Sequence, residues 1–193
     1  MNLLAHLYLA DRTRTSLAGS LMGDVVRGVL QGRYPPEVEE GIRLHRRVDS
    51  FTDAHPIVRA AKARLQPPYR RYAGILLDVY FDHCLALDWE QHHSQSLEEF
   101  VTDSHQTLMR EGLKLAHPGF VLRLTYMRSR NLLLSYRELS GVERALQGLS
   151  TRLSRENPLA TGLEVLRPQA DLLQNDFREF FPELVRFAEE TTR

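Results

Sequence analysis

The chain has 193 residues, with 25 basic and 25 acidic side chains, so its formal net charge is zero when histidine is neutral. This balance argues against nucleic acid as a partner, and the length is typical of one domain. The apolar runs are too short to span a bilayer, and Cys84 is the only cysteine, which excludes an intrachain disulfide. We therefore expect a cytoplasmic protein with no membrane partner; the sequence leaves its oligomeric state open.

Apolar residues recur with helical spacing along nearly the whole chain, and no segment alternates as a strand does. Proline and glycine breaks separate the segments, without a flexible linker or an internal repeat. The pattern predicts one all-α domain, a helical bundle over residues 1–193. The expected helices cover residues 2–10, 16–28, 36–52, 56–66, 69–92, 97–113, 120–127, 131–138, 140–153 and 167–191.

Acidic residues and histidines recur at helical spacing in the expected helix 36–52. His45 and Asp49 are four residues apart, and Asp53 continues the same stripe. The pair alone is consistent with a surface ion pair worth about 0.3 kcal/mol. Arg46 and Arg47 follow His45 and are either phosphate-binding groups or ordinary solvated charges.

A second pair, Asp78 and Asp82, lies in a segment that is apolar on nearly every side. Ionised carboxylates in such a helix need compensation. Arg70 or Arg71 would supply it structurally, whereas a metal ion would supply it functionally. We favour the functional interpretation, because carboxylates and imidazoles together suit a hard or borderline divalent cation.

Three further residues have two interpretations each. His6 lies in an apolar helix, where a lone histidine is more often a core residue than a ligand. Asp24 either joins the cluster or pairs with Arg27. His83 precedes Cys84, but neighbours on a helix point about 100° apart, so a Cys–His nucleophile pair is disfavoured. The sequence also lacks a glycine-rich phosphate loop, Gly-x-Ser-x-Gly, Cys-x-x-Cys and His-Glu-x-x-His.

Several motifs in order resemble the acyl carrier protein phosphodiesterase family, also called acyl carrier protein hydrolases. The resemblance covers essentially the whole chain and is sharpest over residues 1–90. It is carried by residues 1–7 (MNLLAHL), 23–28 (GDVVRG), 41–42 (GI), 45–49 (HRRVD), 52–53 (TD), 77–79 (LDV) and 82–83 (DH).

The resemblance implies a bacterial enzyme that removes the 4′-phosphopantetheine arm from holo-acyl carrier protein. It also implies an HD-domain-like fold and the use of manganese, because the family is similar to divergent HD-domain phosphohydrolases. The usual His-Asp dipeptide is absent here, and Asp82-His83 stands in reverse order.

A divalent cation, Mn²⁺ with Mg²⁺ or Fe²⁺ as alternatives, would polarise the phosphate and activate water. We expect three groups of residues around it. The metal ligands are His6, His45, Asp49, Asp78 and Asp82; the catalytic residues are Asp24, Asp53 and His83; the phosphate-binding residues are Arg27, Arg46 and Arg47.

Two other functions remain open at this point. One is a metal-dependent phosphohydrolase acting on a nucleotide such as guanosine tetraphosphate. The other is a non-catalytic helical module that binds a partner and in which the same histidines and aspartates form internal ion pairs. Metal content separates the second from both enzymes.

Overall fold

The computed structural model describes residues 1–115 and 117–192, with the backbone alone at 113 and 114. Every regular element in this part of the chain is a helix, which confirms the all-α prediction. The first half contains α1 (Leu3–Arg12), α2 (Leu17–Met22), α3 (Pro36–Ala54), α4 (Pro56–Arg64), the 3₁₀ turn η1 (Tyr69–Tyr72), α5 (Ala73–Leu87) and α6 (Trp89–His92).

The second half is also a series of helices, joined by short turns. It contains α7 (Leu97–Leu115), α8 (Pro118–Ser129), α9 (Leu132–Ser135), α10 (Leu139–Ser150), η2 (Leu159–Thr161), α11 (Gly162–Leu166), η3 (Arg167–Gln169) and α12 (Ala170–Thr191). Pro182 lies inside α12, as the sequence predicted.

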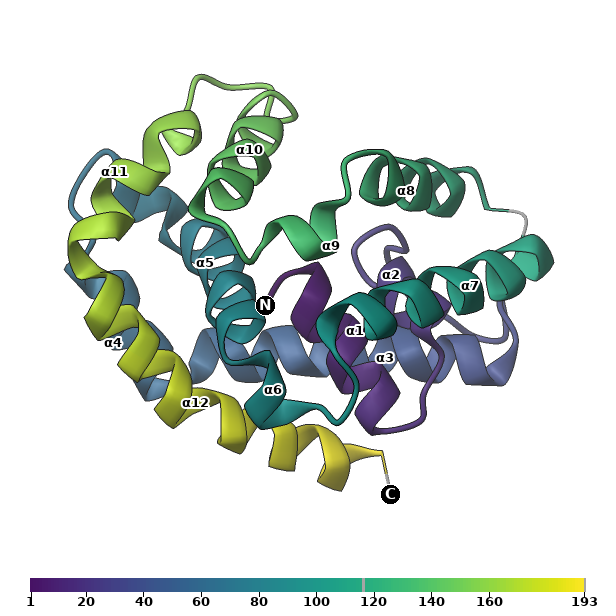
Figure 1. The fold of residues 1–193 in the computed structure, drawn as a ribbon. Helices are drawn as coiled ribbons and strands as arrows, with labels where there is room; N and C mark the ends of the chain where they lie inside the picture. The colour runs from purple at the N-terminus through teal and green to yellow at the C-terminus, as the bar shows by residue number, and fades with distance from the viewer. Residues whose placement is uncertain (116, 193) are drawn as a thin grey trace.

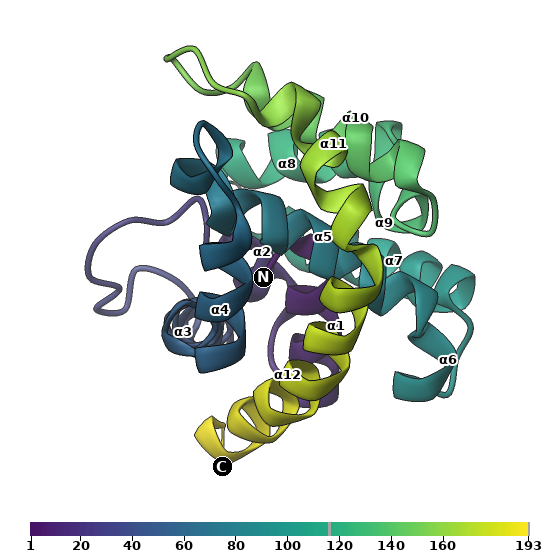
Figure 2. The ribbon, with the colours of Figure 1, turned by 90° about the vertical axis from the view of Figure 1, so that its left-hand side faces the viewer.

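Helix α5 lies among other helices in the left half of Figure 1 and contacts α1, α4, α10, α11 and α12. Its residues Leu76, Phe81, Cys84 and Leu85 are fully buried, as expected of a helix that is apolar all round. The long helix α12 packs against α3, α4 and α5 and runs down one side of the molecule (Figure 2). One core cluster extends from Met1 to Ala188, and a single domain over residues 1–193 stays a prediction.

Two glycines allow α2 and α3 to pack closely. A Cβ added at Gly19 would lie 3.0 Å from the Cα of Gly41, and one added at Gly41 would lie 2.6 Å from the Ser16 carbonyl oxygen. Ser16 also caps α2, because its hydroxyl accepts a hydrogen bond from the Gly19 N–H at 2.9 Å. This contact places the end of α2 beside the middle of α3.

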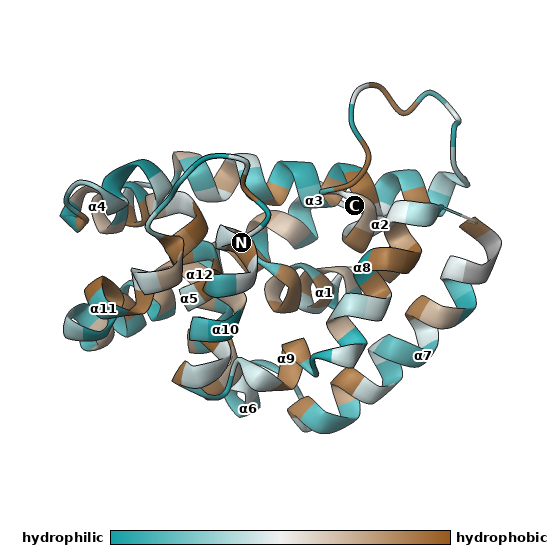
Figure 3. Ribbon diagram, turned by 90° about the horizontal axis from the view of Figure 1, so that it is seen from above, coloured by the Kyte–Doolittle hydropathy of each residue, from teal (hydrophilic) through white to brown (hydrophobic). Residues whose placement is uncertain are grey.

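Two predicted helices were wrong in their extent, and one helical segment was not predicted. The helix expected over 16–28 ends at Met22, and a loop with Gly28 and Gly32 at positive φ follows it (Figures 2 and 3). The helix expected over 69–92 is interrupted at Asp88 and begins as a 3₁₀ turn. Residues 159–166, for which no helix was expected, form η2 and α11. The remaining expected helices are present with shifted ends.

Candidate metal centre

The centre of the site is a pair of stacked imidazoles where α1 meets α3. The rings of His6 and His45 lie 3.7 Å apart between centroids with an interplanar angle of 12°. Both side chains are buried. His6 reaches this position from the first turns of α1, and His45 from the middle of α3.

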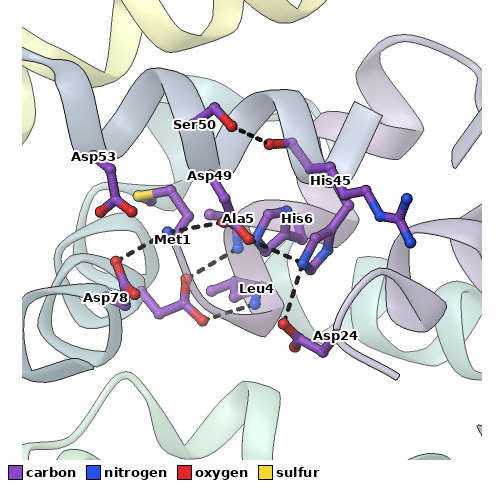
Figure 4. A network of polar contacts seen from close by, with 12 residues as sticks. Met1, Leu4, Ala5, His6, Asp24, His45, Asp49, Ser50, Asp53 and Asp78 are labelled. Atoms are coloured by element: carbon purple, nitrogen blue, oxygen red, sulfur yellow. Dashed lines mark hydrogen bonds and ion pairs between the residues drawn. The ribbon is translucent and has the colours of Figure 1, made fainter. Parts of the chain in front are cut away.

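Asp49 joins the two imidazoles from the next turn of α3 (Figure 4). Its Oδ1 lies 3.0 Å from His6 Nε2, and its Oδ2 lies 3.2 Å from His45 Nε2. Each of the three residues offers one ligand atom, and these atoms all lie within 4.8 Å of one another. The arrangement has the size and the nitrogen–oxygen donor set of a site for a divalent cation.

Asp24 approaches the same imidazole from the loop after α2. Its Oδ1 lies 3.2 Å from His45 Nε2, and its Oδ2 accepts a hydrogen bond from Arg123 on α8. Arg123 was not predicted from the sequence, because no motif connects it to a residue 99 positions earlier. Asp24 therefore connects the imidazole pair to α8.

Gly23 allows this loop to pass next to His45. A Cβ built on Gly23 would fall within the imidazole of His45 and only 2.6 Å from its Cβ. Every other residue type at position 23 would displace either the imidazole or the loop. The sequence shows a glycine directly before Asp24. The reason for that glycine, its close approach to His45, is visible only in the structure.

Burial and mutual contacts set the charges in the site. Burial and the adjacent His45 ring lower the pKa of His6 to about 4, so His6 is a neutral imidazole at pH 7. Burial opposes protonation of His45 as well, but hydrogen bonds to Asp24 and Asp49 outweigh it and raise the His45 pKa. Against the effect of burial, the hydrogen bond from His45 holds the pKa of Asp24 and of Asp49 well below the ordinary range.

The two aspartates of α5 have different partners. Asp78 Oδ1 accepts a hydrogen bond from the Met1 ammonium at 3.0 Å, and the same ammonium lies 3.6 Å from Asp49 Oδ1 (Figure 4). Asp82 is fully buried and accepts the backbone N–H groups of Leu4 at 2.8 Å and Ala5 at 3.1 Å.

Asp82 therefore caps α1 from another helix, a task that the side chain of the N-cap residue Asn2 does not perform. Burial raises the pKa of Asp82 to about 7 despite these two donors. These two hydrogen bonds fix the start of α1, the helix that carries His6. A role of Asp82 as a metal ligand stays a prediction.

The two other expected catalytic residues have partners outside the imidazole cluster. His83 Nδ1 donates to the Tyr136 carbonyl oxygen at 2.6 Å, and burial lowers the His83 pKa. Asp53 is exposed and pairs with Lys62 Nζ at 2.6 Å. Their catalytic roles stay predictions.

Among the described residues, no hydrogen bond or ion pair joins the expected phosphate-binding arginines to the imidazole cluster. Arg27 is exposed in the loop after α2. Arg46 donates to the carbonyl oxygens of Val26 at 2.7 Å and Gly28 at 2.9 Å, and so holds that loop against α3. Arg47 donates to the Thr191 carbonyl oxygen at 3.1 Å, at the end of α12. Binding of phosphate by these three residues stays a prediction.

The comparison with known proteins gives the same family that the ordered motifs resemble. The family described as acyl carrier protein phosphodiesterase matches residues 1–184. The chain is 39% identical over 190 residues to an acyl carrier protein phosphodiesterase of Klebsiella pneumoniae, covering 98% of each chain. It is 38% identical to the protein of that name from Enterobacter sp. and 36% identical to that from Escherichia coli, each over 186 residues and 96% of both chains.

No solved structure matches the chain, so the HD-domain-like fold stays a prediction. Among residues 1–115 and 117–192, no helix is long and apolar enough to cross a membrane. The family match over almost the whole sequence and the identity to these relatives lead to one conclusion: the chain belongs to the acyl carrier protein phosphodiesterase family.

Proposed function

We propose that this protein is a metal-dependent phosphodiesterase that hydrolyses holo-acyl carrier protein to the apo form and 4′-phosphopantetheine. Family membership supports the substrate, and the cluster of His6, His45 and Asp49 supports the chemistry. This cluster is the observation that carries the proposal, because a neutral imidazole, a second imidazole and a carboxylate converge on one point. We also infer a cytoplasmic location, since the relatives are bacterial and Cys84 is a buried free thiol.

The residues present fit a divalent cation. Neutral His6 has its Nε2 directed at the cluster, and the ionised carboxylates of Asp49 and Asp24 supply the opposing charge. His6, His45 and Asp49 would hold the ion, with Asp24 adjacent, and Mn²⁺ suits such mixed ligands. A bound cation would withdraw charge from the phosphate oxygens and lower the pKa of a coordinated water.

The reaction exchanges one phosphorus–oxygen bond for another. The oxygen of a water molecule bonds to phosphorus and the water gives up a proton. The bond from phosphorus to the serine oxygen breaks, and the serine oxygen takes up a proton in its place. Arg123 lies beside Asp24, where its guanidinium would hold a phosphate oxygen through charge-assisted hydrogen bonds. Asp24 is 44% exposed and ionised, so it would orient the attacking water rather than give up a proton.

Mass spectrometry of holo-acyl carrier protein incubated with the enzyme and Mn²⁺ tests the function. We expect the carrier to lose the mass of the arm, and the loss to stop when a chelator removes the metal. Guanosine tetraphosphate serves as the comparison substrate and should remain intact. An unchanged carrier with hydrolysed nucleotide would contradict the proposal in favour of a nucleotide phosphohydrolase.

A further inference from the structure

A groove of about 860 Å³ opens next to the imidazole cluster, between α8 and α10. Figure 3 shows α8, α9 and α10 side by side on this face of the molecule. The volume lies in the range of sites that hold small molecules, about 300–1,000 Å³. Nothing in the proposed chemistry at His6, His45 and Asp49 uses this space.

The groove is continuous with the proposed site through two residues. Val25 lines it and directly follows Asp24, and Arg123 lines it while donating to Asp24 Oδ2. The Nε of Arg123 is buried and has no hydrogen-bond partner among the described residues. The guanidinium of Arg123 thus joins the groove to Asp24, beside the proposed phosphate position.

The charged side chains that line the groove among the described residues are all basic. Arg130, Arg144 and Arg152 line it besides Arg123, and no Asp or Glu does so among the described residues. These three arginines form no ion pair in that part of the chain. Arg152 is held in place, with its guanidinium carbon 4.8 Å from the Tyr126 ring centroid. A ligand with an anionic group fits these charges.

The rest of the lining is neutral and mixed. Ser135, Gln147 and Thr151 offer hydroxyl and amide groups, and Leu122 and Leu132 offer apolar surface. Hydroxyl and amide side chains pair with amides, and leucines pack against methylene groups. These groups match a linear chain of amides and methylenes, and the guanidiniums that line the same groove match a phosphate at one end of that chain.

We propose that this groove binds the pantetheine chain of the substrate, with its phosphate at Arg123. The inference rests on the proposed function for the identity of the ligand. In this arrangement the carrier protein remains outside, and its arm extends from the phosphate position along α8 and α10.

Binding of pantetheine, the neutral arm without phosphate or carrier, tests the inference by calorimetry. Gln147 is exposed on α10, so Gln147→Trp should fill the groove and leave the fold intact. We expect the variant to bind pantetheine about tenfold more weakly than wild type and to raise KM for holo-carrier protein. Glu143→Trp is the matched control, because Glu143 is exposed on the same helix outside the groove. Thr151→Trp is a second blocking variant.

The outcomes separate this inference from the proposed function. No binding of pantetheine to wild type, or equal binding to wild type and both blocking variants, overturns the groove assignment. Weaker binding of apo-carrier protein with unchanged binding of pantetheine also overturns it, in favour of a protein-docking surface. If wild type binds pantetheine and Gln147→Trp does not, yet holo-carrier is never cleaved, the groove stands and the proposed reaction falls.

Discussion

There is no space for a side chain at Gly23, between its loop and His45. A substitution of Gly23 therefore tests whether the site needs His45 in its present position. We expect Gly23→Ala to displace the imidazole and lower kcat by about a hundredfold, because small displacements of reacting groups are costly. Gly74→Ala is the control, since a Cβ there meets only Lys62 at an ordinary 3.7 Å. Steady-state kinetics of both variants checks this. Equal kcat for Gly23→Ala and wild type would mean that His45 is not needed in its present position.

Asp82 supports the site through the start of α1, the helix that carries His6. Asp82→Ala leaves the buried N–H groups of Leu4 and Ala5 without an acceptor, so we expect it to lower the free energy of unfolding by about 3 kcal/mol. Asp82→Asn keeps one acceptor and should cost less. Denaturant unfolding measures the loss, and metal analysis of the folded fraction should find the wild-type content. A stable, metal-free Asp82→Asn protein would instead identify Asp82 as a ligand.

The carboxylate of Asp88, which lies between α5 and α6, joins this part of the chain to α12. Asp88 is buried and accepts hydrogen bonds from Arg178 at 2.8 and 3.0 Å and from Gln174 at 2.7 Å. The hydrogen bonds from Arg178 hold the pKa of Asp88 below the unfolded value of 3.8. A lowered folded-state pKa stabilises the fold above pH 3.8, and this stabilisation disappears as the pH falls below it.

We therefore expect Arg178→Ala to lower Tm by a few degrees at pH 7, and the difference from wild type to shrink as the pH falls through 3.8 and below. Thermal melts followed by circular dichroism across this range measure both effects. Arg186→Ala, at a position on α12 for which the structure gives no ion pair, is the control. A Tm difference that stayed constant down to low pH would exclude the ionised Asp88 as its cause.

How far the sequence predicted the molecule depends on whether a feature is local. Helical periodicity identified most helices, because each follows from its own apolar stripe, and it placed His45 and Asp49 on one face. The interruption at Asp88 was missed because Arg178, which donates hydrogen bonds to Asp88, is 90 residues away and gives no local signal. The helix expected over 16–28 was too long because the apolar residues 25 and 26 continue the pattern after Gly23.

In the candidate site too, features with a local sequence signal were predicted and contacts between distant segments were not. His6 was expected as a ligand only because other candidate ligands occur in the same sequence, and the structure places it beside His45 and Asp49. The spacing of Asp78 and Asp82 predicted a shared face but not their partners, which are backbone and terminal groups near Met1. Arg123 had no local signal at all. Contacts between distant segments decide which charged residues form the site.

Binding of Mn²⁺, followed by electron paramagnetic resonance, tests most directly whether the imidazole cluster is a metal centre. We expect wild type to bind Mn²⁺ and Asp49→Asn to lose most of that binding, since Asp49 contacts both imidazoles. Ser50→Ala, a change at the exposed neighbouring position on α3, should bind as wild type does. Wild-type protein that binds no Mn²⁺, or Asp49→Asn protein that binds it equally well, would contradict the assignment of His6, His45 and Asp49 as the metal centre.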